Sequence, residues 1–388
     1  MHNSLVSHRL PDELIIAIFS DSSLNELDLC QLCLVSRRFL PTVRQELYGT
    51  IRIGCRSTPD PRNFQLMEYD AESWSLLRTL KANPNLAQEV GTIYFFADDI
   101  TPVQESYTGW CQIPAREVVA RIISLASNAK HLQFAGPWFN NGGALMDTIS
   151  HLRDLENLVC DAFHQEELAR VAKSFPRLKH LELTKVVGNA IPLPTFPSLE
   201  LLEIYNSHSQ SQQLYHLITA TSSTLRCLAL NLDILLDLDY SEFPRLHTLV
   251  LGPVDRPRDD SLDSYRRLKV RFDAFFVSLA KAPKLDTLVF QPEPFSEDYD
   301  DLFLPSHRSC RDDPTAGRPL LEGLETIKFE TDVSLDRVVR IIQASWARNV
   351  KKMVMPSTFV EGDGADIQAD AMRGMLGPRD IELILEEF

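Results

Sequence analysis

Few residues in this chain have the types and spacing that could perform chemistry. Cys30 and Cys33 have the Cys-x-x-Cys spacing of a zinc pair, but no second pair or histidine follows at zinc spacing. We interpret both thiols as filling one face of a helix. Segment 362–366, Gly-Asp-Gly-Ala-Asp, lacks the ligand pattern of a calcium loop. His164 and Glu167 are interpreted as surface residues.

The sequence also lacks the motifs of common enzymes. It contains no glycine-rich phosphate loop, no His-Glu-x-x-His and no Gly-x-Ser-x-Gly. We therefore predict a protein that is not an enzyme and that uses no cofactor and no metal ion. An enzyme with an unfamiliar site stays open as an alternative, and it would need acids, bases or metal ligands that converge in a pocket.

Net charge, cysteine count and the lack of long apolar runs indicate which partners the protein can bind and in which cellular compartment we expect it. The net charge is −15, which argues against nonspecific nucleic-acid binding and against anionic membrane surfaces, because both need a positive face. The seven cysteines are scattered and odd in number, so they do not form a disulfide framework. No apolar run is long enough to span a membrane, and the first residues do not resemble a signal peptide. We expect an intracellular protein, cytoplasmic or nuclear, with no membrane and no nucleic-acid partner.

Residues 10–50 contain three predicted helices. Leu10-Pro11-Asp12-Glu13 begins the first, because proline fits the first helical turn and carboxylates complement the positive end of the helix dipole. Ser23 and Glu26 have capping-box spacing and begin the second, and Pro41 begins the third. The apolar faces of so small a unit, about forty residues, have more surface than it can bury alone, so we expect a partner to cover them.

This segment resembles the F-box motif. The matching residues are Leu10-Pro11, Glu13-Leu14-Ile15, Ile18-Phe19, Leu27-Asp28-Leu29, Val35-Ser36-Arg37, Phe39 and Leu47-Tyr48. Phe39 departs from the motif, since many members carry tryptophan there, but it keeps an aromatic side chain. The resemblance implies docking on the Skp adaptor of an SCF (Skp-cullin-F-box) ubiquitin ligase, while the rest of the chain captures a protein substrate. The implied adaptor-binding residues are Leu10, Pro11, Leu14, Ile15, Ile18, Phe19, Leu29, Val35 and Phe39. The alternative is a three-helix cap whose apolar faces turn inward onto a larger fold.

Between residues 90 and 355 a short phrase recurs: apolar, two variable, apolar, one variable, apolar. At this hydrophobic content chance alone supplies many such matches, so the phrase proves little. The dipeptides Phe175-Pro176, Phe196-Pro197 and Phe243-Pro244 carry more weight, because each precedes one copy at the same offset. Several gaps between copies have helical periodicity. The repeating unit is therefore predicted to be a strand, a turn, a helix and a proline that ends the helix.

A single unit of this kind cannot bury its own apolar face, so neighbours must stack into a curved parallel sheet with helices outside. The pattern resembles irregular leucine-rich repeats. The expected Asn or Cys after the third apolar residue is missing, so we expect no regular asparagine ladder. The predicted fold class is thus α/β, an N-terminal three-helix F-box followed by a leucine-rich-repeat-like solenoid. A doubly wound α/β domain is the alternative.

The predicted domains follow from composition. They are an F-box helical domain at 8–51, a turn-rich connector at 52–70, a solenoid at 71–360 and a capping segment at 361–388. Residues 252–267 and 292–319 are predicted to be loops at one rim. Ile381, Ile384, Leu385 and Phe388 have helical spacing and predict a terminal capping helix.

Residues between the apolar anchors of each strand should point to the concave side of the solenoid, where repeat proteins commonly bind. The substrate-binding candidates are Tyr94, Gln133, His180, Glu182, Glu203, Tyr205, Asn231, Thr248, Lys328 and Glu330. Their mixed charge suits a protein or peptide ligand. The leading hypothesis is a substrate receptor that binds the Skp adaptor, a cullin-containing ligase and an unknown protein substrate. The alternative is a repeat scaffold without a role in a ligase.

Overall fold

The structure is a computed structural model of the 388-residue chain. It describes residues 28–29, 31, 40–57, 66–69, 71–97, 111–114, 121–135, 146–147, 149–187, 193–204, 211–252, 262–291, 320–330, 338, 340–341, 343–356 and 365–386. Two compact units are present. Unit 1 comprises residues 1–161 and 174–177, and unit 2 comprises residues 162–173 and 178–388. Of the three helices predicted at the N-terminus, the third is seen as α3 (Leu40–Tyr48), and the other two lie almost wholly outside the described residues.

The sheet of unit 1 has the order β4-β2-β1-β3-β5-β6. Parallel pairing joins β1 (Thr50–Ser57), β3 (Thr92–Ala97), β5 (His131–Ala135) and β6 (Asn157–His164). The short strands β2 (Leu66–Tyr69) and β4 (Cys111–Pro114) extend the sheet in antiparallel fashion. Between β2 and β3 lie α4 (Ala71–Ala82) and α5 (Pro84–Glu89), and Pro84 occupies the first turn of α5. The prediction of a turn-rich connector at 52–70 was wrong for β1 and β2, which belong to the sheet.

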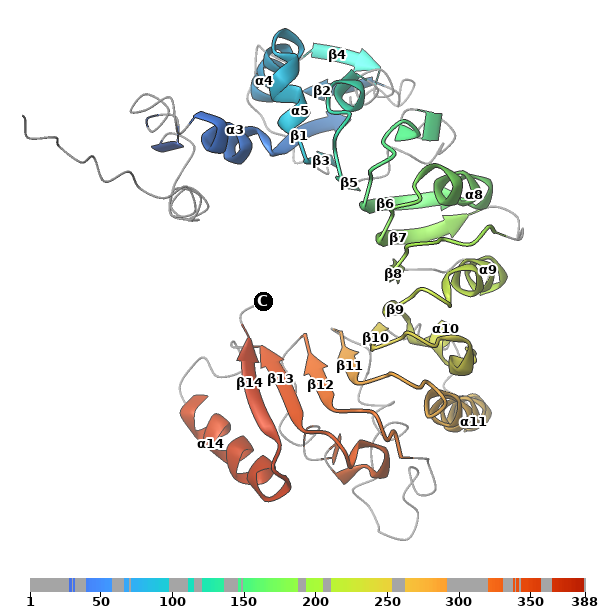
Figure 1. Ribbon diagram of the computed structural model, residues 1–388. Helices are drawn as coiled ribbons and strands as arrows, with labels where there is room; N and C mark the ends of the chain where they lie inside the picture. Colours follow the sequence, from blue (N-terminus) through green and yellow to red (C-terminus); the bar gives the residue numbers. More distant parts are fainter. Residues whose placement is uncertain are drawn as a thin grey trace, which may run out of the picture. The chain divides into compact units, whose positions relative to one another are not determined.

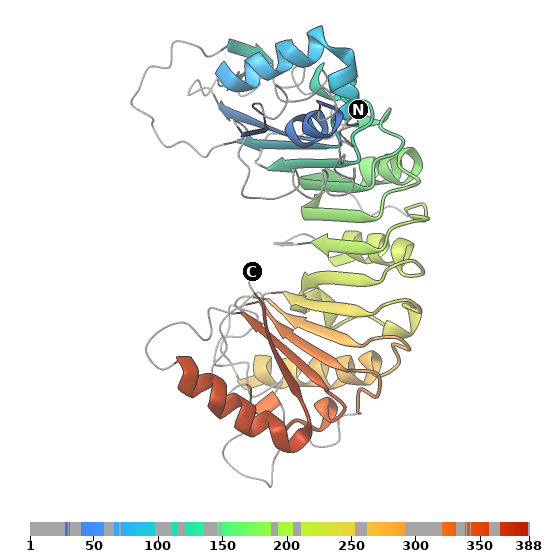
Figure 2. The ribbon, with the colours of Figure 1, turned by 60° about the vertical axis from the view of Figure 1, so that its left-hand side comes forward.

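Unit 2 alternates strands with helices, and the strands pair in parallel from β7 to β14 in chain order. The strands are β7 (His180–Val187), β8 (Leu201–Ile204), β9 (Cys227–Asn231), β10 (Thr248–Gly252), β11 (Thr287–Phe290), β12 (Thr326–Phe329), β13 (Lys352–Pro356) and β14 (Glu382–Glu386). The helical elements are α8 (Gln165–Ser174), α9 (Ser211–Thr221), α10 (Leu232–Leu235), η2 (Tyr240–Glu242), α11 (Leu262–Leu279), η3 (Ser345–Ala347), α14 (Ala365–Leu376) and η5 (Gly377–Arg379). Helices α9, α10 and α11 lie on one side of the sheet of this unit (Figures 1 and 2). The predicted α/β repeat fold with a parallel sheet is confirmed.

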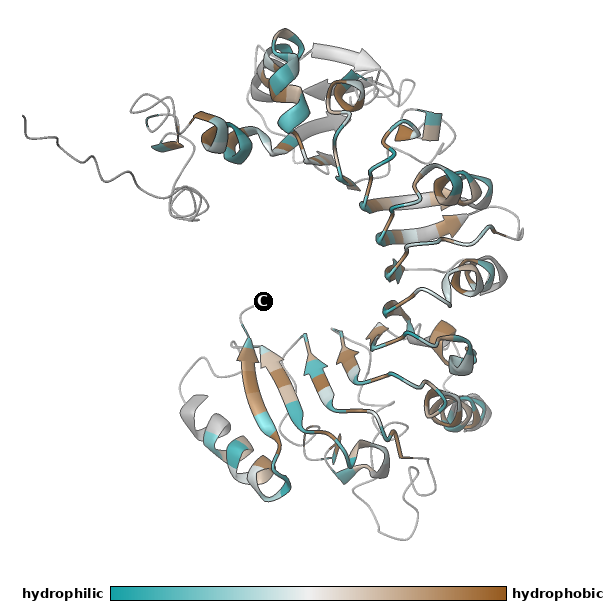
Figure 3. Ribbon diagram, viewed as in Figure 1, coloured by the Kyte–Doolittle hydropathy of each residue, from teal (hydrophilic) through white to brown (hydrophobic). Residues whose placement is uncertain are grey.

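The apolar anchors of the phrase form the core of unit 2. In β8, Leu202 and Ile204 are buried while Leu201 and Glu203 remain partly exposed, and β12 alternates in the same way. Figure 3 shows this alternation of hydrophobic and hydrophilic residues along β12. Because strand side chains alternate between the two faces, one face packs against the helices and the other is presented for other contacts.

A Phe-Pro dipeptide lies a few residues before each of the three strands β7, β8 and β10. Phe175, Phe196 and Phe243 are buried with 1%, 2% and 2% of their surface exposed. In each copy the proline and the following residue form a turn, and a buried leucine comes next. The proline cannot continue a helix, so it directs the chain out of the helical layer and into the next strand.

Acidic and basic side chains pair just before the start of successive strands in unit 2. Glu200 lies 3.6 Å from Arg226, His247 lies 2.9 Å from Asp286, and Glu325 pairs with Lys351 at 2.5 Å. The backbone of these residues also continues the ladder, since Arg226 N–H donates to the Glu200 carbonyl. Exposed pairs of this kind contribute about 0 to 1 kcal/mol each, so we assign them a role in strand register more than in stability.

Five aromatic rings form a continuous row in the helical layer of unit 2. Ring centroids lie 5.9 Å apart for Phe243 and Tyr240, 5.7 Å for Tyr240 and Phe275, 5.4 Å for Phe275 and Phe276, and 5.3 Å for Phe276 and Trp346. The Tyr240 hydroxyl donates to the carbonyl of Leu235 at 3.1 Å, which satisfies the one polar group of that ring. The row joins η2, α11 and η3, three elements far apart in the sequence.

Two predictions about secondary structure in unit 2 were wrong. Residues 382–386 form the parallel strand β14 on β13 and not a capping helix. The loop predicted at 252–267 ends earlier, because α11 already begins at Leu262. Within the described residues, no helix has both the length and the apolar character needed to cross a bilayer.

Candidate functional site

The open face of unit 2 is the sheet face that carries the residues between the apolar anchors. The structure places on its strands, or directly after them, seven of the ten predicted substrate-binding residues, namely His180, Glu182, Glu203, Asn231, Thr248, Lys328 and Glu330. Tyr205 lies outside the described residues. Tyr94 and Gln133 belong to unit 1, where they are direct partners on β3 and β5. The guanidinium of Arg52, which the sequence analysis missed because it lies in the supposed connector, is 5.8 Å from the Tyr94 ring centroid.

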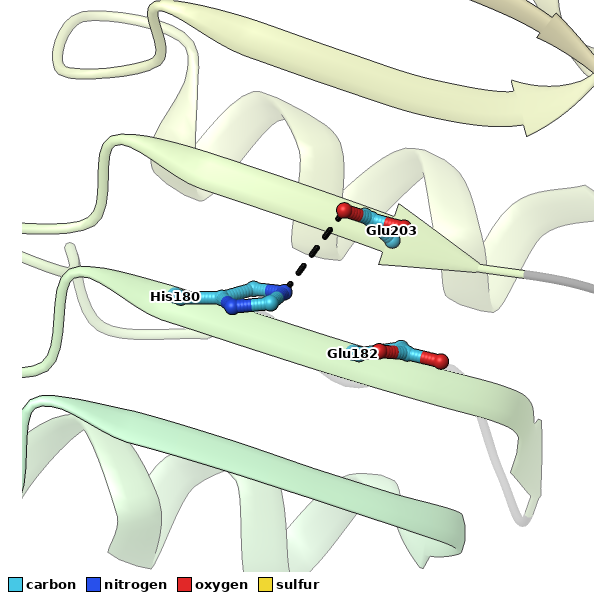
Figure 4. A group of neighbouring side chains, drawn as sticks. All are labelled: His180, Glu182 and Glu203. Carbon is cyan, nitrogen blue, oxygen red and sulfur yellow. Dashed lines mark ion pairs between the residues drawn. The ribbon is translucent and has the colours of Figure 1, made fainter. Parts of the chain in front are cut away.

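The most concentrated chemistry on the open face comes from three side chains of two adjacent strands. His180 and Glu182 are two residues apart on β7, so they share a face, and Glu182 pairs directly with Glu203 of β8. His180 Nε2 lies 3.7 Å from Glu203 Oε1, and both side chains are 21% exposed. Figure 4 shows the His180 ring directed toward Glu203, with Glu182 further along β7 on the same face. Ligand atoms of all three residues lie within 4.8 Å of one another.

Burial and mutual repulsion raise the pKa values of two carboxylates on this face, those of Glu182 and Glu330. Partial burial raises the pKa of Glu182 above its ordinary value, and the charge of Glu203 raises it further. Burial also raises the pKa of Glu330, against the lowering effects of Lys328 and of a hydrogen bond with Gln291, and the charge of Glu203 again adds to the rise. The field of Glu203 thus acts on acids from both β7 and the end of β12. The carboxylate of Glu203 therefore repels those of Glu182 and Glu330.

Cys227 of β9 lies in the same field. Burial raises the pKa of its thiol to about 12, and the charges of Glu203 and Glu330 contribute to the rise. Its side chain packs against a buried apolar cluster formed by Ala229, Val250 and Val289. A thiol in these surroundings is protonated at neutral pH and is therefore a poor nucleophile.

We expect Cys227 to react slowly with alkylating reagents. A pKa of about 12 lowers the thiolate fraction at neutral pH roughly a thousandfold, and the greater nucleophilicity of a basic thiolate offsets part of this loss. Alkylation of Cys227 by iodoacetamide in the native protein should therefore be at least about tenfold slower than that of a free cysteine peptide. Mass spectrometry of the peptide that contains Cys227 separates it from the other cysteines. A rate equal to that of the free peptide would contradict the partly buried position of Cys227 beside Glu203 and Glu330.

The apolar cluster of Ala229, Val250 and Val289 was not predicted. These residues stand between anchors on β9, β10 and β11, yet they are 1%, 8% and 5% exposed. The strand sequences, such as Thr-Leu-Val-Leu in β10, are apolar at nearly every position, which is typical of strands buried on both faces. That continuous pattern was the signal that could have identified them.

Buried polar groups depart from the sequence interpretation at two places. Glu167 of α8, interpreted as a surface residue, is buried with 5% of its surface exposed. Asn231, a predicted contact residue at the end of β9, is 2% exposed, and its Oδ1 has no hydrogen-bond partner among the described residues. By contrast, Lys328 and Glu330 remain partly exposed, and Lys328 Nζ donates to Glu386 Oε2 at 2.8 Å.

Of the nine predicted adaptor-binding residues, only Leu29 is described, and it is buried with 7% exposed. The other eight, Leu10, Pro11, Leu14, Ile15, Ile18, Phe19, Val35 and Phe39, lie outside the described residues. Their role stays a prediction.

Comparison with known proteins identifies the N-terminal segment. The F-box-like family model matches residues 7–51, so this part of the chain is an F-box-like domain. No curated protein matches the sequence significantly.

Among solved structures, a TLR13–ssRNA13 complex is similar over 77% of this chain, with 12% identity and a TM-score of 0.35. A complex of Rad7 and Elc1 in yeast is similar over 60%, with 14% identity and a TM-score of 0.25. The matches span 36% and 64% of those chains.

Proposed function

We propose that this chain is the substrate-recognition subunit of an SCF ubiquitin ligase. In this proposal the F-box-like domain at 7–51 binds the Skp adaptor, and the repeat units bind a protein target. The observation that carries the proposal is the F-box-like match itself, since it stands in one chain with a repeat fold that offers a large face for binding.

The chain would contribute to ubiquitin transfer by position alone. Holding a lysine of the target near the ubiquitin-charged enzyme raises its effective concentration, and this requires no reacting group from the receptor. The raised pKa values of Glu182 and Glu330 support an open face that suits cationic partners, because a cation there relieves the repulsion among the acids. A target with a basic segment is therefore the class that we propose.

Co-purification with the adaptor tests the first half of the proposal. The tagged full-length chain is expressed in cells, and the Skp adaptor and cullin that it retains are quantified. The double variant Leu10→Asp, Pro11→Ala places a charge in the implied apolar contact, so we expect it to lose at least about tenfold of the bound adaptor. The matched control is Glu182→Gln with Glu203→Gln, which lies in unit 2 and should retain the adaptor fully.

The same experiment separates the two forms of the hypothesis. Adaptor and cullin together in the wild-type complex support the ligase role, whereas adaptor without cullin supports a scaffold that does not join a ligase. Adaptor binding that survives the double variant unchanged would overturn the assignment of 7–51 as the docking site. Treatment with a proteasome inhibitor before purification should enrich the target, and the control variant should lose it if the open face binds it.

A further inference from the structure

We propose that His180, Glu182 and Glu203 form a binding site for one divalent metal ion of the Zn²⁺ class. This differs from the sequence prediction that the protein binds no metal, and it does not rest on the proposed ligase role. The three residues were each predicted to face a partner, but their convergence as a ligand set is visible only in the structure.

The geometry is close to that of a bound ion. Zn²⁺ bonds to nitrogen and oxygen are about 2.0 to 2.2 Å long, so neighbouring ligands of a tetrahedral ion lie about 3.3 Å apart. The His180 Nε2 to Glu203 Oε1 distance is 3.7 Å. No pair among the three ligand atoms is separated by more than 4.8 Å. Closing these gaps needs movements of about 1.5 Å at most, which side-chain rotations supply while the paired strands β7 and β8 stay fixed.

The placement of Glu182 against Glu203 also needs a physical reason. Like charges directly opposite each other on neighbouring strands destabilise a sheet, and these two carboxylates are register partners on one face. A divalent cation between the two carboxylates turns that repulsion into attraction, and the imidazole of His180 supplies the third bond.

The ligand types select the ion. Imidazole suits Zn²⁺, Cu²⁺ and Ni²⁺, whereas sites for Mg²⁺ and Ca²⁺ use oxygen ligands alone. One histidine with two carboxylates on a single face leaves at least one coordination position open, as in zinc sites with three protein ligands. Water fills that position in the free protein. Because the set lies on the open face, a ligand side chain of a bound protein could replace the water.

Zinc binding by the purified full-length chain tests the site. The protein is stripped with a chelator, and Zn²⁺ is titrated by calorimetry against a competing chelator near neutral pH. The cysteines elsewhere in the chain can also bind zinc. The test is therefore the difference between the wild type and each variant in the number and affinity of bound Zn²⁺. We expect Glu203→Gln, Glu182→Gln and His180→Gln each to bind one Zn²⁺ fewer than the wild type, or to bind it more than about 100-fold more weakly.

Two control variants are available in the same unit. His247→Gln removes a histidine that lies 2.9 Å from a single carboxylate, that of Asp286, and Glu200→Gln removes a carboxylate one position before β8. Neither should change the zinc count, because neither side chain belongs to the three-ligand set.

Thermal melting distinguishes loss of the site from loss of the fold. In chelator, Glu182→Gln should melt at or above the temperature of the wild type, because it removes a like-charge contact and leaves the pair of His180 with Glu203 in place. Added Zn²⁺ should raise the melting temperature of the wild type more than that of either glutamate variant, since an ion bound only by the native state stabilises it. Equal zinc counts, affinities and zinc-dependent melting shifts in the wild type and in both glutamate variants would overturn the proposal. So would a wild type that binds no Zn²⁺.

Discussion

Replacing Phe276 with alanine should lower the free energy of unfolding of unit 2 by about 3 to 5 kcal/mol. The side chain is 1% exposed and stands in the middle of the aromatic row, in contact with Phe275 at 5.4 Å and with Trp346 at 5.3 Å. The alanine variant loses the buried area, leaves a cavity, and also loses two ring contacts of about 0.5 to 1.5 kcal/mol each. Urea unfolding followed by tryptophan fluorescence and far-ultraviolet circular dichroism measures the change.

The next residue on α11 provides the control. Val277 is 54% exposed, so Val277→Ala should alter the free energy of unfolding by no more than about 0.5 kcal/mol. Both variants shorten a side chain on the same turn of the same helix and differ in the face they occupy. If the two variants unfolded at the same urea concentration, α11 would not pack as described.

The repeat could be predicted because each unit carries its own local signals. Phe196 and Pro197 end one connection, and Leu202 and Ile204 mark the buried side of the strand that follows. These signals depend only on neighbours in the sequence, so they identify strand type and side-chain direction without knowledge of the rest of the fold.

The aromatic row could not be predicted in the same way. Tyr240, Phe275 and Trp346 come from segments separated by long connections, and only the stacking of units brings them together. At the C-terminus, the spacing of Ile381, Ile384 and Leu385 fits a helix, but pairing with β13 decides in favour of a strand. The strand β1 was also missed, because its pairing partner β3 lies about forty residues further along the chain.

The candidate site was predicted in its parts and missed as a set. Strand periodicity is sufficient to place His180 and Glu182 on one face. Whether Glu203 lies opposite Glu182 or opposite a neighbour depends on the register between β7 and β8, and a shift by one residue would send it to the other face. Phe175-Pro176 and Phe196-Pro197 precede the two strands at the same offset and therefore indicated this register, but the sequence analysis did not use them to compare side chains across the strands.

The largest loss of stability is expected from Leu249→Asp. Leu249 is fully buried in β10, where it pairs with Leu228 of β9 and Leu288 of β11, themselves 0% and 2% exposed. A carboxylate at this position has no partner, and its desolvation adds to the lost leucine packing. The cost should exceed about 4 kcal/mol, a large share of the total of about 5 to 15 kcal/mol that stabilises a typical domain. We expect unit 2 to unfold, with loss of protection from limited proteolysis.

Thr248→Asp is the control for Leu249→Asp, because the two neighbouring side chains point to opposite faces of the sheet. Thr248 lies on the open face, is only partly buried, and pairs with Cys227 and Thr287. Thr248→Asp should therefore change the free energy of unfolding by no more than about 1 kcal/mol, because water still reaches the new carboxylate. The assignment of every residue to the open face, including the proposed zinc ligands, depends on this alternation. If Thr248→Asp unfolded the protein and Leu249→Asp did not, the two faces of the sheet would be exchanged.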